Sequence, residues 1–303
     1  MKFIKHYIII LFSLISLFSC QLNNDLNNNK PDIVTTIFPL YDFTKQIAKD
    51  KVNVELVLPP GVEPHSFEPK PRSIFEIRKA DLFIYTGDFL EVWALNIIDV
   101  LDSDKVINTS TNVTLIHNHE HIDPHIWIDP ENAKIMVDNI LNSLIKIDPE
   151  NKTFYEENAS DYKAQLEELN LCYQDLFANV KHKTIIFGGH YVFGYLSEKY
   201  NIKYVSPYKG YSPDTLPTPR NIQNLIKLLN NTDQNTLFYE EIINPEVAEI
   251  IAKETKAKLL PLNGAGNVSK SIIKNNLTYL DIMYQNIERL KEGLGYNEWY
   301  YYN

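Results

Sequence analysis

The chain has 303 residues, a length typical of about two domains, each large enough to enclose an apolar core. Charged residues make up 22% and apolar residues 44%, which is typical of a globular chain and argues against a largely disordered or membrane-embedded one. The formal net charge of −10 argues against a nucleic-acid partner, because binding to phosphates requires a basic surface.

The first residues have the pattern of an export signal. Two lysines precede an apolar run of about a dozen residues, which is the length of a signal-peptide core and too short to span a bilayer as a helix. The run ends in LFSC, which resembles the lipobox of bacterial lipoproteins, although Phe18 stands where a small residue is usual. We therefore predict cleavage of residues 1–19 and lipidation of Cys20. The alternative is an uncleaved anchor helix.

The segment after Cys20 is expected to hold the folded part of the chain off a membrane. Residues 20–30 are rich in Asn and nearly free of large apolar side chains, which predicts a flexible tether. Cys172 is the remaining cysteine and has no partner once Cys20 carries lipid, so we predict that the chain has no intrachain disulfide. The predicted location is extracytoplasmic and membrane-anchored, in a periplasm or on a cell surface.

From Ile33 onward, short β-rich runs alternate with helical periodicity, the pattern of parallel sheets covered by helices. In the first half we predict strands over residues 33–37, 52–58, 82–85 and near 106, and helices over 40–48, 73–79, 91–101 and 131–147. In the second half we predict strands over 184–187, 203–205, 236–239 and 258–262, and helices over 191–200, 220–229, 245–255 and 275–291. This predicts an α/β fold with two four-stranded parallel-sheet lobes.

The most regular segment of the chain lies between these halves. Eight apolar or aromatic residues recur there at spacings of three and four, which places them on one helical stripe: Tyr155, Ala159, Tyr162, Leu166, Leu169, Tyr173, Leu176 and Val180. A helix over residues 149–180 would be roughly 48 Å long. We predict a rigid backbone helix at 149–181 between lobes 31–148 and 182–303, with little opening and closing of the lobes. The alternative is a coiled-coil arm.

The stretch HNHEHIDPHIWIDP, residues 117–130, holds four histidines among acidic residues and therefore suggests a divalent transition metal. His125 lies between a proline and an apolar pair, so we predict that it is an ordered ligand. His117, His119 and His121 alternate with polar residues. They would form either a low-affinity collar around the site or a plain solvated loop.

Further ligands are expected after strands, because ligands of parallel sheets bind beyond the carboxyl ends of the strands. His65 follows a predicted strand after PPGVEP, and His190 follows another after two glycines. Glu240 ends the strand TLFYE, and Asn263 follows KLLPL. Three histidines at matching topological positions favour a shared site in the cleft between the lobes.

From Ile33 to about Leu290 the chain resembles the bacterial ABC-transporter solute-binding proteins for zinc and manganese. The resemblance depends above all on GVEPH with FEPKP and on DPHIWIDP, and GGHYVFGYLSEKYNIK is another matching piece. It implies two α/β lobes joined by a long helix, with the metal buried between them. It also implies that His65 and His125 are ligands from the first lobe and that His190 is the first ligand from the second.

The fourth ligand of this family is usually an aspartate after the last strand of the second lobe, where this chain has Asn263. Two solutions are open: three histidines with water or Asn263 in the fourth position, or Glu240 as a direct ligand. We favour the first, because three histidines suffice for a tetrahedral zinc site with one open position. Glu240 would then orient a histidine through its other ring nitrogen.

The predicted function is that of a monomeric lipoprotein that captures Zn²⁺ and presents it to an ABC permease. Three imidazoles favour Zn²⁺ over the harder Mn²⁺, and in the resembling family a histidine at the position of His190 goes with zinc. A manganese receptor of the same family is the first alternative. A zinc hydrolase is another, but the chain has no HExxH motif, and we do not expect an enzyme. A surface adhesin with the same fold is the third.

Overall fold

The computed structural model describes residues 30–118, 121–213, 216–242 and 245–297. The predicted signal peptide, the lipidation site Cys20, the tether up to residue 29 and His119 lie outside the described residues. Among the helices that are described, none has both the length and the apolar character needed to cross a membrane.

The first lobe contains a parallel sheet of four strands in the order β2-β1-β3-β4. All four residues of β3 are buried, as expected for a strand with helices on both faces. Ile33 of β1 faces a core shared with α2 and α5, whereas Val34 faces a smaller core beneath α3 and α4. The elements are β1 (Asp32–Thr35), α2 (Phe38–Ala48), β2 (Asn53–Leu56), α3 (Pro71–Lys79), β3 (Leu82–Tyr85), α4 (Leu95–Ile98), β4 (Val106–Asn108) and α5 (Pro130–Ile147).

The helix predicted over residues 91–101 is wrong in its extent. A 3₁₀ turn at Val92–Ala94 precedes the short α4, and no helix continues past Ile98. The buried carboxylate of Glu91 explains the late start, because it accepts hydrogen bonds from the backbone N–H groups of Thr86 and Gly87, both at 3.1 Å. Glu91 therefore fixes the loop after β3 instead of beginning a helix.

The second lobe contains two parallel strand pairs, β7 with β8 and β9 with β10. A single parallel bridge from Phe187 to Phe238 joins the pairs, and the N–H of Gly188 donates to the carbonyl of Phe238 at 2.7 Å. The predicted four strands are thus present, and among the described residues one bridge links the two pairs. The elements are β7 (Thr184–Ile186), α7 (Gly194–Lys199), β8 (Lys203–Val205), α8 (Pro219–Asn230), β9 (Thr236–Glu240), α9 (Glu246–Thr255), β10 (Lys258–Leu262), α10 (Lys270–Lys274) and α11 (Tyr279–Leu294).

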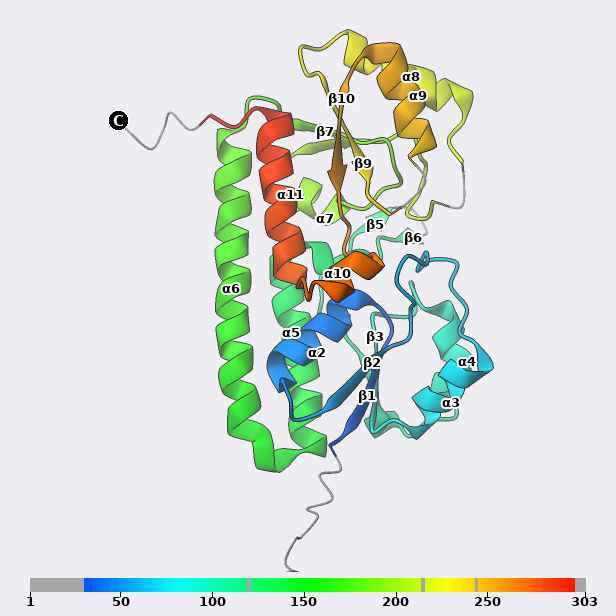
Figure 1. Ribbon diagram of the computed structural model, residues 1–303, viewed down its shortest axis with the longest axis vertical. Coiled ribbons are helices and arrows are strands. Elements are labelled where there is room, and N and C mark those ends of the chain that lie inside the picture. The colour runs from blue at the N-terminus through cyan, green and yellow to red at the C-terminus, as the bar shows by residue number, and fades with distance from the viewer. Residues whose placement is uncertain (1–29, 119–120, 214–215, 243–244, 298–303) are drawn as a thin grey trace, which may run out of the picture. The chain divides into compact units, whose positions relative to one another are not determined.

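The long helix α6 (Lys152–Asn179) has 28 residues and follows a 3₁₀ turn at Pro149–Asn151. It runs beside α5 and α2 of the first lobe and beside α11 of the second (Figure 1). All eight residues of the predicted stripe are at most 5% exposed, so the stripe packs within the molecule and does not form a coiled-coil arm. One apolar core continues from the first sheet, along α6, into the second lobe. The predicted architecture of two lobes joined by one long helix is confirmed.

Three features near the cleft and towards the end of the chain were not predicted. A short antiparallel hairpin joins β5 (His117–Asn118) to β6 (His121–Ile122), and a 3₁₀ turn at Ile126–Ile128 leads into α5. Helix α11 begins four residues later than predicted, because the hydroxyl of Thr278 and the carboxylate of Asp281 form a capping box at Tyr279.

Candidate metal centre

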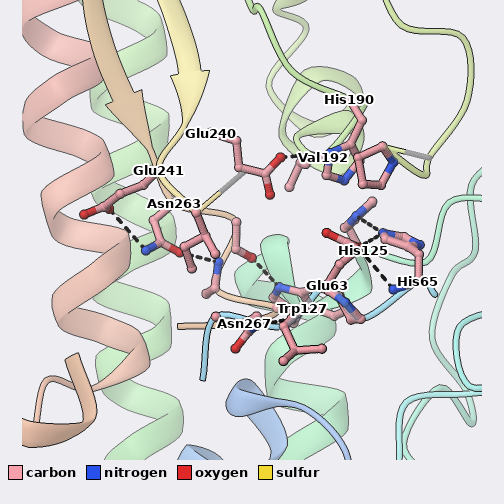
Figure 2. Close-up of a pocket in the computed structure, with 18 residues that line it drawn as sticks. Glu63, His65, His125, Trp127, His190, Val192, Glu240, Glu241, Asn263 and Asn267 are labelled. Atoms are coloured by element: carbon pink, nitrogen blue, oxygen red, sulfur yellow. Dashed lines mark hydrogen bonds and ion pairs between the residues drawn. The ribbon is translucent and has the colours of Figure 1, made fainter. Parts of the chain in front are cut away.

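A cavity of about 290 Å³ lies where loops from both lobes meet (Figure 2). The first lobe contributes the loop after β2 and the segment after β6. The second lobe contributes the loops that follow β7, β9 and β10. Most of these loops leave the carboxyl ends of parallel strands, which is where this class of sheet binds ligands. The residues that matter for the site are Glu63, His65, Asp123, His125, Trp127, His190, Glu240 and Asn263.

Local sequence explains why each histidine points into this cavity. Gly61, at φ +86°, and the prolines around it turn the chain away from β2 before His65. His190 follows Gly188 and Gly189, where a Cβ atom would lie 2.7 Å from Ala248 and from the ring of Phe187, respectively. Glycine is therefore required for the close approach that brings this loop to the cleft.

The three predicted histidines converge. One ring nitrogen from each of His65, His125 and His190 lies within 4.8 Å of the others, and the Nε2 atoms of His65 and His125 are 3.3 Å apart. Ligand atoms of a tetrahedral zinc ion with bonds of about 2.0–2.1 Å are separated by about 3.3–3.4 Å. His125 and His190 are only 3% and 2% exposed. Such buried nitrogens fit a transition-metal ion.

Carboxylates lie behind two of these imidazoles. Asp123 Oδ1 is 2.8 Å from His125 Nδ1 and also accepts the backbone N–H of His125 at 3.0 Å. Glu240 Oε2 is 2.8 Å from His190 Nδ1, an ion-pair contact visible in Figure 2. A carboxylate at Nδ1 fixes the ring orientation and leaves Nε2 as the donor to a metal. Asp123 is fully buried, and its backbone carbonyl accepts a hydrogen bond from the hydroxyl of Tyr195 at 3.0 Å.

The electrostatics of the cluster favour neutral imidazoles at two positions. Burial lowers the pKa of His65 from 6.5 to about 2, and the charges of His125 and His190 add to this effect. Burial and then the charge of His190 also hold the pKa of His125 well below its ordinary value. For His190, burial again opposes protonation, but the charge and contact of Glu240 outweigh it and raise the pKa of His190.

Asn263 lines the cavity but uses its side chain elsewhere. Its Oδ1 accepts the N–H of Ala265 at 2.8 Å, and its Nδ2 donates to Glu241 at 3.3 Å. In Figure 2, Asn263 and Glu241 lie together on the side of the cavity away from His65 and His125. The Asn263 amide, which was predicted as a possible fourth ligand, instead forms hydrogen bonds with Glu241 and Ala265 in this structure.

The described members of the histidine tract, His117 and His121, are not part of the three-histidine cluster. His117 and His121 are exposed on the β5–β6 hairpin, and neither belongs to the group of converging nitrogens. Asp123 was missed by the sequence analysis, although its place two residues before His125 was visible in the motif DPH. Glu63 has the same place before His65, in EPH, and was also missed.

Comparisons with known proteins place the chain in a family. Residues 33–293 match the family described as "Zinc-uptake complex component A periplasmic". The chain is 36% identical to the high-affinity zinc uptake system protein ZnuA of Bacillus subtilis over 287 residues, which are 89% of each chain. It is 31% identical over 307 residues to the zinc-binding lipoprotein AdcA of Streptococcus pneumoniae, covering 95% of this chain but only 61% of AdcA.

The fold agrees with these sequence matches. The crystal structure of the Zn(II)-bound ZnuA-like domain of Streptococcus pneumoniae AdcA superposes with a TM-score of 0.77 at 32% identity, covering 88% of this chain and 99% of that domain. The sequence match extends over both lobes and the connecting helix, and all three converging histidines fall within it. The chain therefore belongs to the family of periplasmic zinc-uptake complex component A proteins.

Proposed function

We propose that this protein captures Zn²⁺ outside the cytoplasmic membrane and delivers it to the permease of an ABC transporter. The observation that carries the proposal is the convergence of His65, His125 and His190, from both lobes, on one point. Neutral imidazole nitrogens suit Zn²⁺ better than Mn²⁺, which prefers more oxygen donors. Membership of a zinc-uptake family, together with relatives named for zinc binding, supports the same ion.

In this proposal the three histidines are the ligands, Glu240 orients His190 and Asp123 orients His125. The lobes are residues 31–148 and 182–303, with 149–181 as the connecting helix, and the chain acts as a monomer. The proposal is tested with the chain that lacks residues 1–19, purified free of metal. Its binding of Zn²⁺ is measured by calorimetry and by competition with a chromophoric chelator. Tight binding of one Zn²⁺ per chain with much weaker Mn²⁺ binding is the expected result. Equal or stronger binding of Mn²⁺ would favour the manganese receptor instead.

Zinc affinity is expected to fall as the pH is lowered, with one proton competing for the site. The pKa of His190 is raised above 6.5. At a pH below this pKa, His190 carries a proton that zinc must displace, so the apparent affinity for zinc falls about tenfold per pH unit. Above the raised pKa the affinity levels off. His65 and His125 have lowered pKa values, stay neutral over this range and add no slope. Chelator competition between pH 5 and pH 9 measures the slope, and a loss of two or three protons per ion would contradict this assignment.

We further propose that Cys20 is the lipidated first residue of the mature protein and that residues 20–30 tether it to the membrane. The apolar run followed by LFSC supports this, as does the relationship to a protein named as a lipoprotein. Replacing Cys20 by Ser is expected to move the protein from the membrane fraction of the cell to the soluble extracytoplasmic fraction. Retention of Cys20→Ser in the membrane fraction would instead indicate an uncleaved anchor helix.

A further inference from the structure

Two of the three histidines follow the same local pattern of carboxylate, proline and histidine. The first is EPH at residues 63–65 and the second is DPH at residues 123–125. In both, the carboxylate accepts the backbone N–H of the histidine two residues later, at 3.1 Å for Glu63 and 3.0 Å for Asp123. In both motifs the acidic side chain therefore folds back onto its own histidine.

The extra methylene of Glu63 changes which ring nitrogen the carboxylate reaches. Asp123 Oδ1 lies 2.8 Å from His125 Nδ1, the nitrogen on the outer side of the cluster. Glu63 Oε1 instead lies 3.8 Å from His65 Nε2, the nitrogen that faces His125 at 3.3 Å. The ligand atoms of a tetrahedral zinc site are about 3.3–3.5 Å apart. Glu63 Oε1 is not among the atoms that lie within 4.8 Å of one another, so the side chain would have to turn further into the cavity to reach a ligand position.

The other oxygen donors at the cavity are engaged in ways that keep them from the shared centre. Glu240 Oε2 lies 2.8 Å from Nδ1 of His190 and is engaged with this ring. Asn263 and Glu241 contact each other, and the amide oxygen of Asn263 is used by the N–H of Ala265. Glu63 also lines this cavity, and its Oε1 lies 3.8 Å from the His65 nitrogen that faces His125.

Contacts with the second lobe hold the loop that carries Glu63. The N–H of Gly61 donates to the carbonyl of Val268 at 3.0 Å, and the side-chain amide of Asn267 donates to the carbonyl of Val62. The side chain of Glu63 is 25% exposed, in contrast to the 2% of His190, so it lies at the rim of the site. An ion that enters from solvent would meet this carboxylate before the buried imidazole of His190.

We propose that Glu63 is the fourth ligand of the zinc ion and supplies the one anionic oxygen in a site of three neutral imidazoles. This inference rests on the proposed function. Three neutral imidazoles bring no charge of their own to balance the +2 charge of a largely buried ion, and Glu240 acts only through the ring of His190. A carboxylate ligand removes half of that charge. It also takes the fourth coordination position, which Asn263 does not occupy. The ion then has four protein ligands, as in a structural zinc site.

The test compares Glu63→Gln with a matched variant, Glu68→Gln, which removes one negative charge from an exposed position in the same loop. Glu63→Gln is nearly isosteric and is expected to weaken zinc affinity by at least about 10–100-fold, the loss seen even for groups that only orient ligands. Glu68→Gln is expected to leave the affinity within about twofold. Thermal unfolding of the metal-free variants checks that both fold as the unchanged chain does.

A crystal structure of the zinc-loaded chain, with anomalous scattering at the zinc edge, gives the second measurement. We expect Glu63 Oε1 at about 2.0–2.2 Å from zinc. Water or another residue in that position, or a Glu63→Gln variant with unchanged affinity, would overturn the assignment of Glu63 while leaving zinc binding intact. An unchanged chain that takes up no zinc would overturn the proposed function, and this inference with it.

Discussion

Replacing both His65 and His190 by alanine is expected to abolish tight zinc binding. The double substitution removes two of the three converging nitrogens, one from each lobe, and leaves His125 as the only imidazole of the cluster. Structural zinc sites contribute about 10–16 kcal/mol in total, so we expect a loss of at least about 4 kcal/mol, or about 1,000-fold in affinity. Chelator competition and metal analysis of the purified variant measure this loss.

The matched control is His117→Ala combined with His121→Ala, which also removes two histidines but from the exposed β5–β6 hairpin. Tight binding is expected to survive in this control, while any additional weak binding sites are lost. A double variant of His65 and His190 that still binds zinc as the unchanged chain does would remove the basis of the proposed site. Loss of tight zinc binding in the hairpin control would indicate that the zinc site lies in the histidine tract.

Gly194→Ala is expected to weaken zinc binding although residue 194 touches no metal ligand directly. A Cβ atom at this position would lie 2.3 Å from Asp123 Oδ2 and 2.6 Å from the ring of Tyr191. Asp123 is fully buried and orients His125, so the displaced carboxylate turns this imidazole away from its partners. Loss of an orienting group typically costs about 10–100-fold in metal affinity, which is the effect expected here.

Helix propensity makes this variant informative. Gly194 begins α7, and alanine is a better helix former than glycine by about 1 kcal/mol, so weaker binding cannot be attributed to a weaker helix. Glu198→Ala, at an exposed position of the same helix, is the control and is expected to bind zinc normally. Calorimetric titration of both variants, with circular dichroism to verify folding, gives the comparison. Unchanged affinity in Gly194→Ala would show that Asp123 does not position His125.

Much of the fold could be predicted because the sequence marks it locally. The strands at Leu82–Tyr85, Lys203–Val205 and Lys258–Leu262 have the predicted bounds, since turn residues and polar side chains end each apolar run. The stripe of α6 was visible because its period matches a helix over many turns. The region after β3 was not predictable in the same way, because its helix start depends on where the side chain of Glu91 finds hydrogen-bond donors.

The site was predictable in its topology but not in its contacts. The sequence shows that His65 and His190 follow predicted strands. The carboxyl ends of parallel strands bring such residues together. The use of the Asn263 amide depends on a left-handed residue, Ala265 at φ +55°, which turns the loop back on itself. Residue types alone do not show such a reversal. The positions of Glu63 and Asp123 were written in EPH and DPH, but their reach depends on side-chain length and on the loop around them.

The shared interior of the two lobes has a consequence for how an ion leaves the protein. Trp127, buried in the first lobe, donates from Nε1 to the carbonyl of Gly264 in the second lobe at 2.7 Å, and Tyr279 of α11 donates to the carbonyl of Trp127. Separating the two lobes would expose buried aromatic side chains to water and break the hydrogen bonds of these polar groups. The ion is therefore expected to leave the protein without separation of the two lobes at this contact.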